Sequence, residues 1–222
     1  MSLKDQEFLY NIFRREIKDR KIPLSLGKTC PVKCTFCYEM DHSYRKTFET
    51  PLTTQEHWEF IFNEIKSFPT RESESWILGG NEYMEWTDLA LHPKAMDWIE
   101  EFLDQTDKKI TMFSVGYFDP VRINKLAEKY PGRINFELSV ITLGSYREEL
   151  MPKGPSVKQV LAVLDGPAVT SANFYSFGPG SMSQDAKQIS DINKDCLLWM
   201  GCLTPLKYID ADTTKVMRQG KR

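Results

Sequence analysis

Three cysteines stand close together in the first quarter of the sequence and are well suited to bind a metal. Cys30, Cys34 and Cys37 fall within eight consecutive positions of a 222-residue chain that contains five cysteines. Thiolates are soft ligands, and a four-iron four-sulfur cluster normally takes one thiolate for each iron. Three thiolates leave one iron with an open position, and an open position is typical of a catalytic metal centre.

The spacing resembles the Cx3CxΦC motif of the radical S-adenosylmethionine superfamily, in which Φ is an aromatic residue, here Phe36 between Cys34 and Cys37. This resemblance implies that Cys30, Cys34 and Cys37 hold a 4Fe-4S cluster whose open iron chelates the amino and carboxylate groups of S-adenosylmethionine. An electron from the cluster would cleave this molecule to methionine and a 5'-deoxyadenosyl radical, which removes a hydrogen atom from a substrate. Phe36 would shield the cluster and pack near the adenine. Such an enzyme needs a low-potential electron donor such as flavodoxin or ferredoxin.

A zinc site is the structural alternative for the same residues. Cys34, Cys37 and His42 have the spacing of the first three ligands of a zinc knuckle, but Thr47 stands where the last cysteine would fall. Cys30 as the fourth ligand would give a closed Cys3His site. A second class of function therefore stays open, in which the chain is a non-catalytic interaction or sensor module that binds zinc or an iron-sulfur cluster.

A double glycine follows the second expected strand. Gly79 and Gly80 precede Asn81 and Glu82, whereas the family usually has two glycines followed directly by an acidic residue. The resemblance implies that the glycines let the backbone approach S-adenosylmethionine and that Glu82 or Asn81 faces its ammonium group. A tight turn is the plainer interpretation.

Ser139 and Arg147 are further candidates for binding the cofactor. Some family branches use a polar strand residue and a following arginine for the ribose hydroxyls and the carboxylate of S-adenosylmethionine. An arginine fork suits a carboxylate. The alternative is that Ser139 faces a polar barrel interior and that Arg147 is a solvated surface charge. Glu137 shares the face of Ser139 because strand side chains alternate, and it is a third candidate.

Cys196 and Cys202 lie far from the motif along the chain. Two thiols are too few for a second cluster with four cysteine ligands. Either one could donate a hydrogen atom to a substrate radical, although unpaired cysteines are more often buried core residues. For His57 and His92 we expect packing or surface contacts rather than metal binding.

These residues would be positioned by strands that alternate with helices. Such alternation predicts an α/β fold with a parallel sheet. About six strand-helix units fit an open, partial TIM-type barrel of the (β/α)6 kind, and a doubly wound sheet would fit the same pattern. We expect one domain over 1–222, with an N-terminal helix at about 3–20 and a polar tail at about 210–222. The expected strands cover residues 22–26, 76–78, 110–115, 134–141, 169–177 and 197–203. Thr53 with Glu56 predicts a capping box, Asp119 with Pro120 predicts the start of another helix, and Ser156 can cap a further one.

The composition excludes several classes of protein. Hydrophobic residues make up 41%, which argues against disorder, and 29 basic against 31 acidic residues give no strong nucleic-acid signal. No run approaches the length of a membrane span, and the N-terminus lacks the apolar core of a secretory signal. We therefore expect a cytoplasmic protein without a disulfide framework. The sequence leaves open whether the substrate is a small molecule or a macromolecule.

Overall fold

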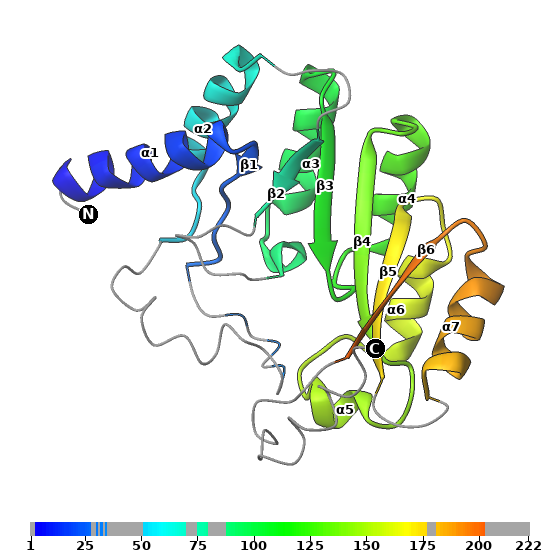
Figure 1. Cartoon of the computed structure of the whole chain (residues 1–222). Coiled ribbons are helices and arrows are strands. Elements are labelled where there is room, and N and C mark those ends of the chain that lie inside the picture. The colour runs from blue at the N-terminus through cyan, green and yellow to red at the C-terminus, as the bar shows by residue number, and fades with distance from the viewer. Residues whose placement is uncertain are drawn as a thin grey trace, which may run out of the picture.

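A six-stranded, all-parallel sheet is the centre of the fold (Figure 1). The computed structural model describes residues 3–27, 30, 32, 34, 51–69, 75–79, 88–176 and 181–202. The strands pair in the order in which they occur along the chain. They are β1 (Lys21–Ile22), β2 (Ser75–Leu78), β3 (Lys109–Ser114), β4 (Ile134–Ile141), β5 (Val169–Ser176) and β6 (Leu197–Cys202).

Helices connect the strands and cover one face of the sheet (Figure 1). The α3, α4, α6 and α7 helices follow one another across this face, and each contacts the next. The helices of the described residues are α1 (Leu3–Lys18), α2 (Gln55–Ser67), the 3-10 helix η3 (Leu89–Leu91), α3 (Ala95–Gln105), α4 (Pro120–Lys129), α5 (Arg147–Leu150), α6 (Val157–Leu164) and α7 (Ser181–Ile192).

The strand order separates the two topologies that the sequence left open. A doubly wound sheet contains a point at which the strand order reverses, and helices then cover both faces. Here the order runs from β1 to β6 without reversal, and the four helices from α3 to α7 named above lie on one face. The prediction of a parallel α/β fold is confirmed, and the sheet is singly wound.

Alternation along the strands gives the sheet two different faces. Met112, Leu138 and Phe174 face the helices and are fully buried in the core. We call the opposite side the open face. Its side chains are the ones that alternate with the core residues, and they include Ser75, Ile77, Thr111, Phe113, Asn135, Glu137, Ser139, Asn173, Leu197 and Trp199.

Several helix starts agree with the sequence, and one differs by a residue. Asp119 caps α4 with Pro120 in the first turn, and Ser156 caps α6, as predicted. The α2 helix is capped by Thr54 in a capping box with His57, whereas the sequence pattern pointed to Thr53 and Glu56. Thr53 has another role, because its Oγ1 accepts a hydrogen bond from Ser25 N at 2.8 Å.

The N-terminal region also differs from the expectation. The first strand contains two residues, because Pro23 has no N–H to continue the ladder. The first helix ends at Lys18, two residues before the predicted end. None of the described helices is long and apolar enough to cross a membrane. The expected polar tail at 210–222 lies outside the described residues.

Candidate functional site

Two of the three motif cysteines lie at the edge of the sheet where the strands end. Cys30 and Cys34 are partly exposed and pack against one small apolar group that is separate from the main core. We call this group the carboxyl-edge patch. Its members are Val32, Leu91, Val115, Tyr117, Ile141, Leu150 and Met151. Since Val115 follows β3 and Ile141 ends β4, the fold brings both thiols to the carboxyl ends of two neighbouring strands.

The third motif cysteine, Cys37, lies outside the described residues, as do Phe36 and His42. Among the residues that are described, no three His, Cys, Asp or Glu side chains are close enough to hold a metal ion. Thiolates from Cys30 and Cys34 are nevertheless the donor type that iron-sulfur clusters and structural zinc both use.

Backbone strain marks the end of β4, next to these cysteines. Ile141 has a φ of 67°, in the left-handed region that a β-branched residue rarely adopts. The register of β4 against β5 also shifts between Ser139 and Ile141. Bulges and unusual backbone angles of this kind cost free energy and are often found at functional sites.

Arg147 holds this strained segment in place. Its Nη1 donates to the carbonyl oxygens of Val140 and Thr142, the residues on either side of Ile141, with a distance of 3.0 Å to Thr142 O. Its Nε donates to Pro155 O at 3.1 Å. The side chain is only 4% exposed, so the interpretation of Arg147 as a solvated surface charge is wrong.

The Arg147 guanidinium also affects the electrostatics of the cysteine region. Burial lowers its pKa, and electrostatic interactions with Cys34, Tyr117 and Asp185 oppose this shift. The Nη2 atom is buried and has no hydrogen-bond partner, so one donor of the predicted carboxylate-binding fork is not used by the protein.

Asp88 is a buried acid at the same carboxyl edge of the sheet. The sequence did not predict it as a residue of the site. Its carboxylate accepts hydrogen bonds from Val115 N at 2.8 Å, Ser114 Oγ at 2.9 Å and Ala90 N at 3.0 Å. Burial raises the pKa of Asp88 to about 6, although these hydrogen bonds oppose the shift. Asp88 therefore ties η3 to the end of β3. An aspartate before a short apolar turn was the available signal, since this residue type often caps helices.

The phenol of Tyr117 interacts electrostatically with the acid, the cysteines and the arginine. Its hydroxyl donates a hydrogen bond to Lys153 O. Burial raises the pKa of Tyr117, and so do the charges of Asp88, Cys30 and Cys34, whereas Arg147 lowers it. All four groups therefore influence the pKa of one phenol at the carboxyl edge of the sheet.

A hollow of about 860 Å³ opens beside Arg147 at this edge. The connections from β4 through α5 to α6 form its walls, and its lining includes Leu143, Gly144, Arg147, Met151, Pro155 and Ser156. A hollow of this size is within the range of small-molecule sites. Its lining begins at Leu143, two residues after the strained Ile141, and includes Arg147.

Gly79 is explained by packing within the protein. It has a φ of 72°, and its N–H donates to Ile22 O at 3.0 Å. A Cβ placed on it would lie 2.2 Å from Leu89 Cδ1. Leu89 therefore occupies the space that a side chain at this position would need, so packing within the protein already requires a glycine here, and the approach of the Gly79 backbone to S-adenosylmethionine stays a prediction. Gly80 and Glu82 lie outside the described residues.

Ser139 and Glu137 lie on the open face of β4, as the alternation predicted. Both side chains are partly exposed. Ser139 pairs in register with Asn173 of β5, and Asn173 Nδ2 donates a hydrogen bond to Glu137 Oε1. The alternative for Ser139, in which it faces a polar interior, agrees with these neighbours.

The two remaining cysteines are at opposite ends of β6. Cys196 immediately precedes the strand, and its Sγ lies 3.7 Å from Leu197 O. Burial raises the pKa of the Cys196 thiol to about 11. Cys202 is the last residue of the strand, roughly 20 Å farther along it. Of the two predicted hydrogen-atom donors, only Cys202 lies at the carboxyl edge of the sheet, where Cys30 and Cys34 also lie.

The histidines contribute to local structure, as expected. His57 Nδ1 accepts from Thr54 N at 3.3 Å in the α2 capping box. His92 Nε2 lies 3.2 Å from Thr53 O, and its Nδ1 accepts from Lys94 N at 3.1 Å. Burial lowers the pKa of both imidazoles.

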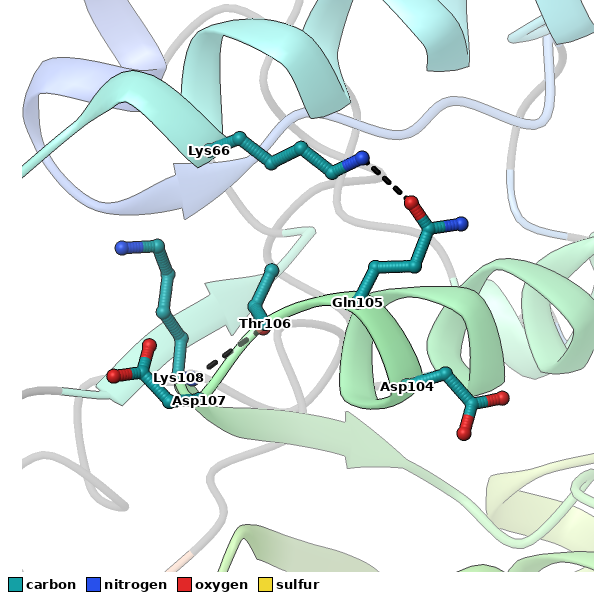
Figure 2. A pocket seen from close by; sticks show the side chains of 6 residues that line it. All are labelled: Lys66, Asp104, Gln105, Thr106, Asp107 and Lys108. Atoms are coloured by element: carbon teal, nitrogen blue, oxygen red, sulfur yellow. Dashed lines mark hydrogen bonds between the residues drawn. The ribbon is translucent and has the colours of Figure 1, made fainter.

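A second hollow lies at the amino edge of the sheet, where α2 and α3 end and β3 begins. Its volume is about 380 Å³, and it is lined by Lys66, Asp104, Gln105, Thr106, Asp107 and Lys108 (Figure 2). Lys66 Nζ donates to Gln105 Oε1 at 2.6 Å (Figure 2). Lys108 Nζ donates to Phe68 O at 3.0 Å. Both ammonium groups bind the protein itself, and open α/β sheets bind ligands at the carboxyl edge. This hollow is therefore the weaker candidate.

No family model matches the chain, and no curated protein matches it either. The fold and the site therefore define its class: an α/β protein with a singly wound parallel sheet, two partly exposed cysteines at the carboxyl edge, and a buried arginine and a buried acid beside them.

Proposed function

We propose that this chain is a radical S-adenosylmethionine enzyme whose sheet belongs to an open (β/α)6 barrel. The observation that carries the proposal is the position of Cys30 and Cys34. Two cysteines of a Cx3CxΦC motif pack against one patch at the carboxyl ends of β3 and β4. Barrels and open sheets of parallel strands have their active sites at this edge. The strand order and the helices on one face are compatible with such a barrel.

The donor set fits an iron-sulfur cluster. Cys30, Cys34 and Cys37 would hold the cluster, and Arg147 would offset part of the negative charge that three thiolates and sulfide bring. When bound, the cluster would supply the electron that cleaves S-adenosylmethionine and so starts hydrogen-atom removal from the substrate. This requires a low-potential electron donor such as flavodoxin or ferredoxin, and a reducing, cytoplasmic location suits the thiols.

The remaining residues would bind and position the reactants. Gly80 and Glu82 stay candidates for the ammonium group of S-adenosylmethionine, and Ser139 for its ribose. Arg147 would mainly hold the end of β4, because its Nε and Nη1 already bind backbone carbonyls. Only Nη2 would be left for a carboxylate in the adjoining hollow. The open face would receive the substrate.

Anaerobic reconstitution with iron and sulfide tests the proposal. We expect about four irons per chain. We also expect an absorbance shoulder at roughly 400 nm, because such a shoulder is typical of thiolate-bound iron clusters. With dithionite and S-adenosylmethionine, the protein should release 5'-deoxyadenosine. Cys30→Ala, Cys34→Ala and Cys37→Ala should each lose the shoulder and the product. Cys196→Ala is the matched control and should keep both, because Cys196 lies at the amino end of β6.

Two results would overturn the proposal and favour the other class of function. Tight zinc binding without iron uptake would indicate a Cys3His structural site. A stable cluster that never cleaves S-adenosylmethionine under reducing conditions would indicate a non-catalytic interaction or sensor module.

A further inference from the structure

The open face of the sheet carries a partly buried carboxylate whose position is fixed by a neighbouring strand. Glu137 of β4 accepts a hydrogen bond at Oε1 from the side-chain amide of Asn173 of β5. Both side chains are partly buried. Among the described residues of β2 to β6, Glu137 is the only acidic side chain on this face.

No cation of the described residues offsets this charge. The ion pairs of that part of the chain do not include Glu137. Lys109 is on the same face, but it lies four residues before Phe113, the register partner of Glu137, and thus roughly 13 Å away along β3. A carboxylate that has lost part of its hydration is stabilised most by a bound cation or by further hydrogen bonds.

An exposed indole stands beside this carboxylate. Trp199 of β6 pairs in register with Asn173, and its side chain is 57% exposed. Neighbouring strands are roughly 5 Å apart, so the indole lies next to the Asn173 amide that holds Glu137. The face of a tryptophan ring attracts cations, and more strongly than that of tyrosine or phenylalanine. An acceptor and a cation-binding ring therefore lie side by side.

We propose that Glu137, Asn173 and Trp199 form a recognition site for a positively charged amine or guanidine group. Glu137 accepts hydrogen bonds from the cation, Asn173 holds the carboxylate in position, and Trp199 covers the charge with its ring. This inference deepens the proposed function and rests on it in one respect: the bound molecule is the substrate from which the hydrogen atom is removed.

The position of the site also limits the shape of the substrate. Glu137 lies four residues before Ile141, the residue of β4 that belongs to the patch against which Cys30 and Cys34 pack. Four strand residues span roughly 13 Å. The substrate would be an elongated molecule with its cationic end on Glu137 and its reacting carbon toward the carboxyl edge. A lysine or arginine side chain within a larger molecule, or a long-chain amine, has this form.

Titration of the full chain with three probes of equal length but different charge tests the inference. The probes are hexylammonium, hexanol and hexanoate, and the signal is the indole N–H resonance of Trp199 in protein labelled with 15N-tryptophan. The Trp199→Phe variant assigns this signal among the five tryptophans of the chain. We expect a saturable shift with hexylammonium, and at least tenfold weaker binding of hexanol and hexanoate.

Glu137→Gln should weaken hexylammonium binding at least tenfold, because the amide keeps the acceptor for Asn173 but loses the charge. Glu128→Gln on the exposed side of α4 is the matched control and should leave binding unchanged. Equal binding of hexylammonium and hexanol, no shift of the Trp199 signal, or unchanged binding in Glu137→Gln would each overturn the inference.

The two proposals fail in different ways. Protein that releases 5'-deoxyadenosine but does not bind hexylammonium refutes the recognition site and leaves the enzyme class standing. Protein that binds hexylammonium through Glu137 but takes up no iron refutes the enzyme class, and with it the role of this site in binding a radical substrate.

Discussion

Gly79, which follows β2, has no side chain, and this lets η3 pack closely against it. Its backbone adopts a positive φ, and the space beside its Cα is filled by Leu89 of η3. The N-cap of η3 is Asp88, which in turn binds Ser114 and Val115 at the end of β3. Gly79 therefore contributes to the site indirectly, since it lets η3 pack closely enough for Asp88 to reach β3.

We expect Gly79→Ala to lower the free energy of unfolding by at least ~2 kcal/mol. About 1 kcal/mol follows from the left-handed backbone, and the remainder from the contact with Leu89. Gly132→Ala is the matched control, because Gly132 has a φ of 70° and nothing within 4 Å of an added Cβ. It should show only the backbone cost. Urea unfolding of both variants gives the comparison, and equal losses would mean that the contact with Leu89 is unimportant.

At the scale of elements, the end of β4 is the part of the site with the most unusual geometry. Ile141 is in a strained conformation, and one arginine binds the carbonyls on both sides of it. The same arginine reaches Pro155 just before α6. Thr142 and Leu143 are fixed from the other side by Asp185 of α7, at 2.8 and 3.2 Å. Residues 140–143, next to the cysteines, are thus held by side chains of two later helices, Arg147 of α5 and Asp185 of α7.

Arg147→Lys should therefore destabilise the protein although it keeps the charge. A lysine cannot reproduce the fork that serves three carbonyl oxygens, and buried acceptors without donors cost free energy. We expect a loss of about 3 kcal/mol in the free energy of unfolding, measured in urea.

Arg122→Lys is the matched control for this substitution. Arg122 binds Asp97 and Glu100 at the surface and is 39% exposed, so its loss should be at most about 1 kcal/mol. Similar losses in the two variants would show that the buried hydrogen bonds of Arg147 contribute little.

For the whole molecule, the buried Asp88 couples stability to pH. Its pKa is raised from 3.8 to about 6 in the folded protein, so between these values the folded state keeps a proton that the unfolded state has released. The contribution of Asp88 to the free energy of unfolding therefore falls as the pH rises from about 4 to about 6, and it is constant above that range.

Comparison of the native chain with Asp88→Asn isolates this contribution. The free energy of unfolding of the native chain, minus that of the variant, should decrease by up to about 3 kcal/mol between pH 4 and pH 7. The measurement is urea unfolding of the two proteins at several pH values without added metal. A difference that does not change with pH would mean that Asp88 titrates normally.

The sequence by itself determined the features that depend on nearby residues. Alternation and helical spacing predicted β3 to β6 within a residue or two, and single side chains predicted the caps at Asp119 and Ser156. It also singled out Cys30, Cys34 and Cys37 as the residues with metal chemistry. Local propensities and motif spacing are sufficient for such predictions, because the residues concerned are neighbours along the chain.

Only the tertiary structure decided the features that depend on distant residues. The order of the strands, the burial of Arg147 among backbone carbonyls, and the hydrogen bond between Glu137 and Asn173 each join segments that are apart in the sequence. The same is true of Asp88, whose pKa follows from burial against β3. Arg147, for which the sequence offered either cofactor binding or a solvated surface position, binds backbone carbonyls in the interior, and Gly79 packs against Leu89. Packing between distant elements fixes such surroundings of a residue, and the spacing of residues along the chain does not.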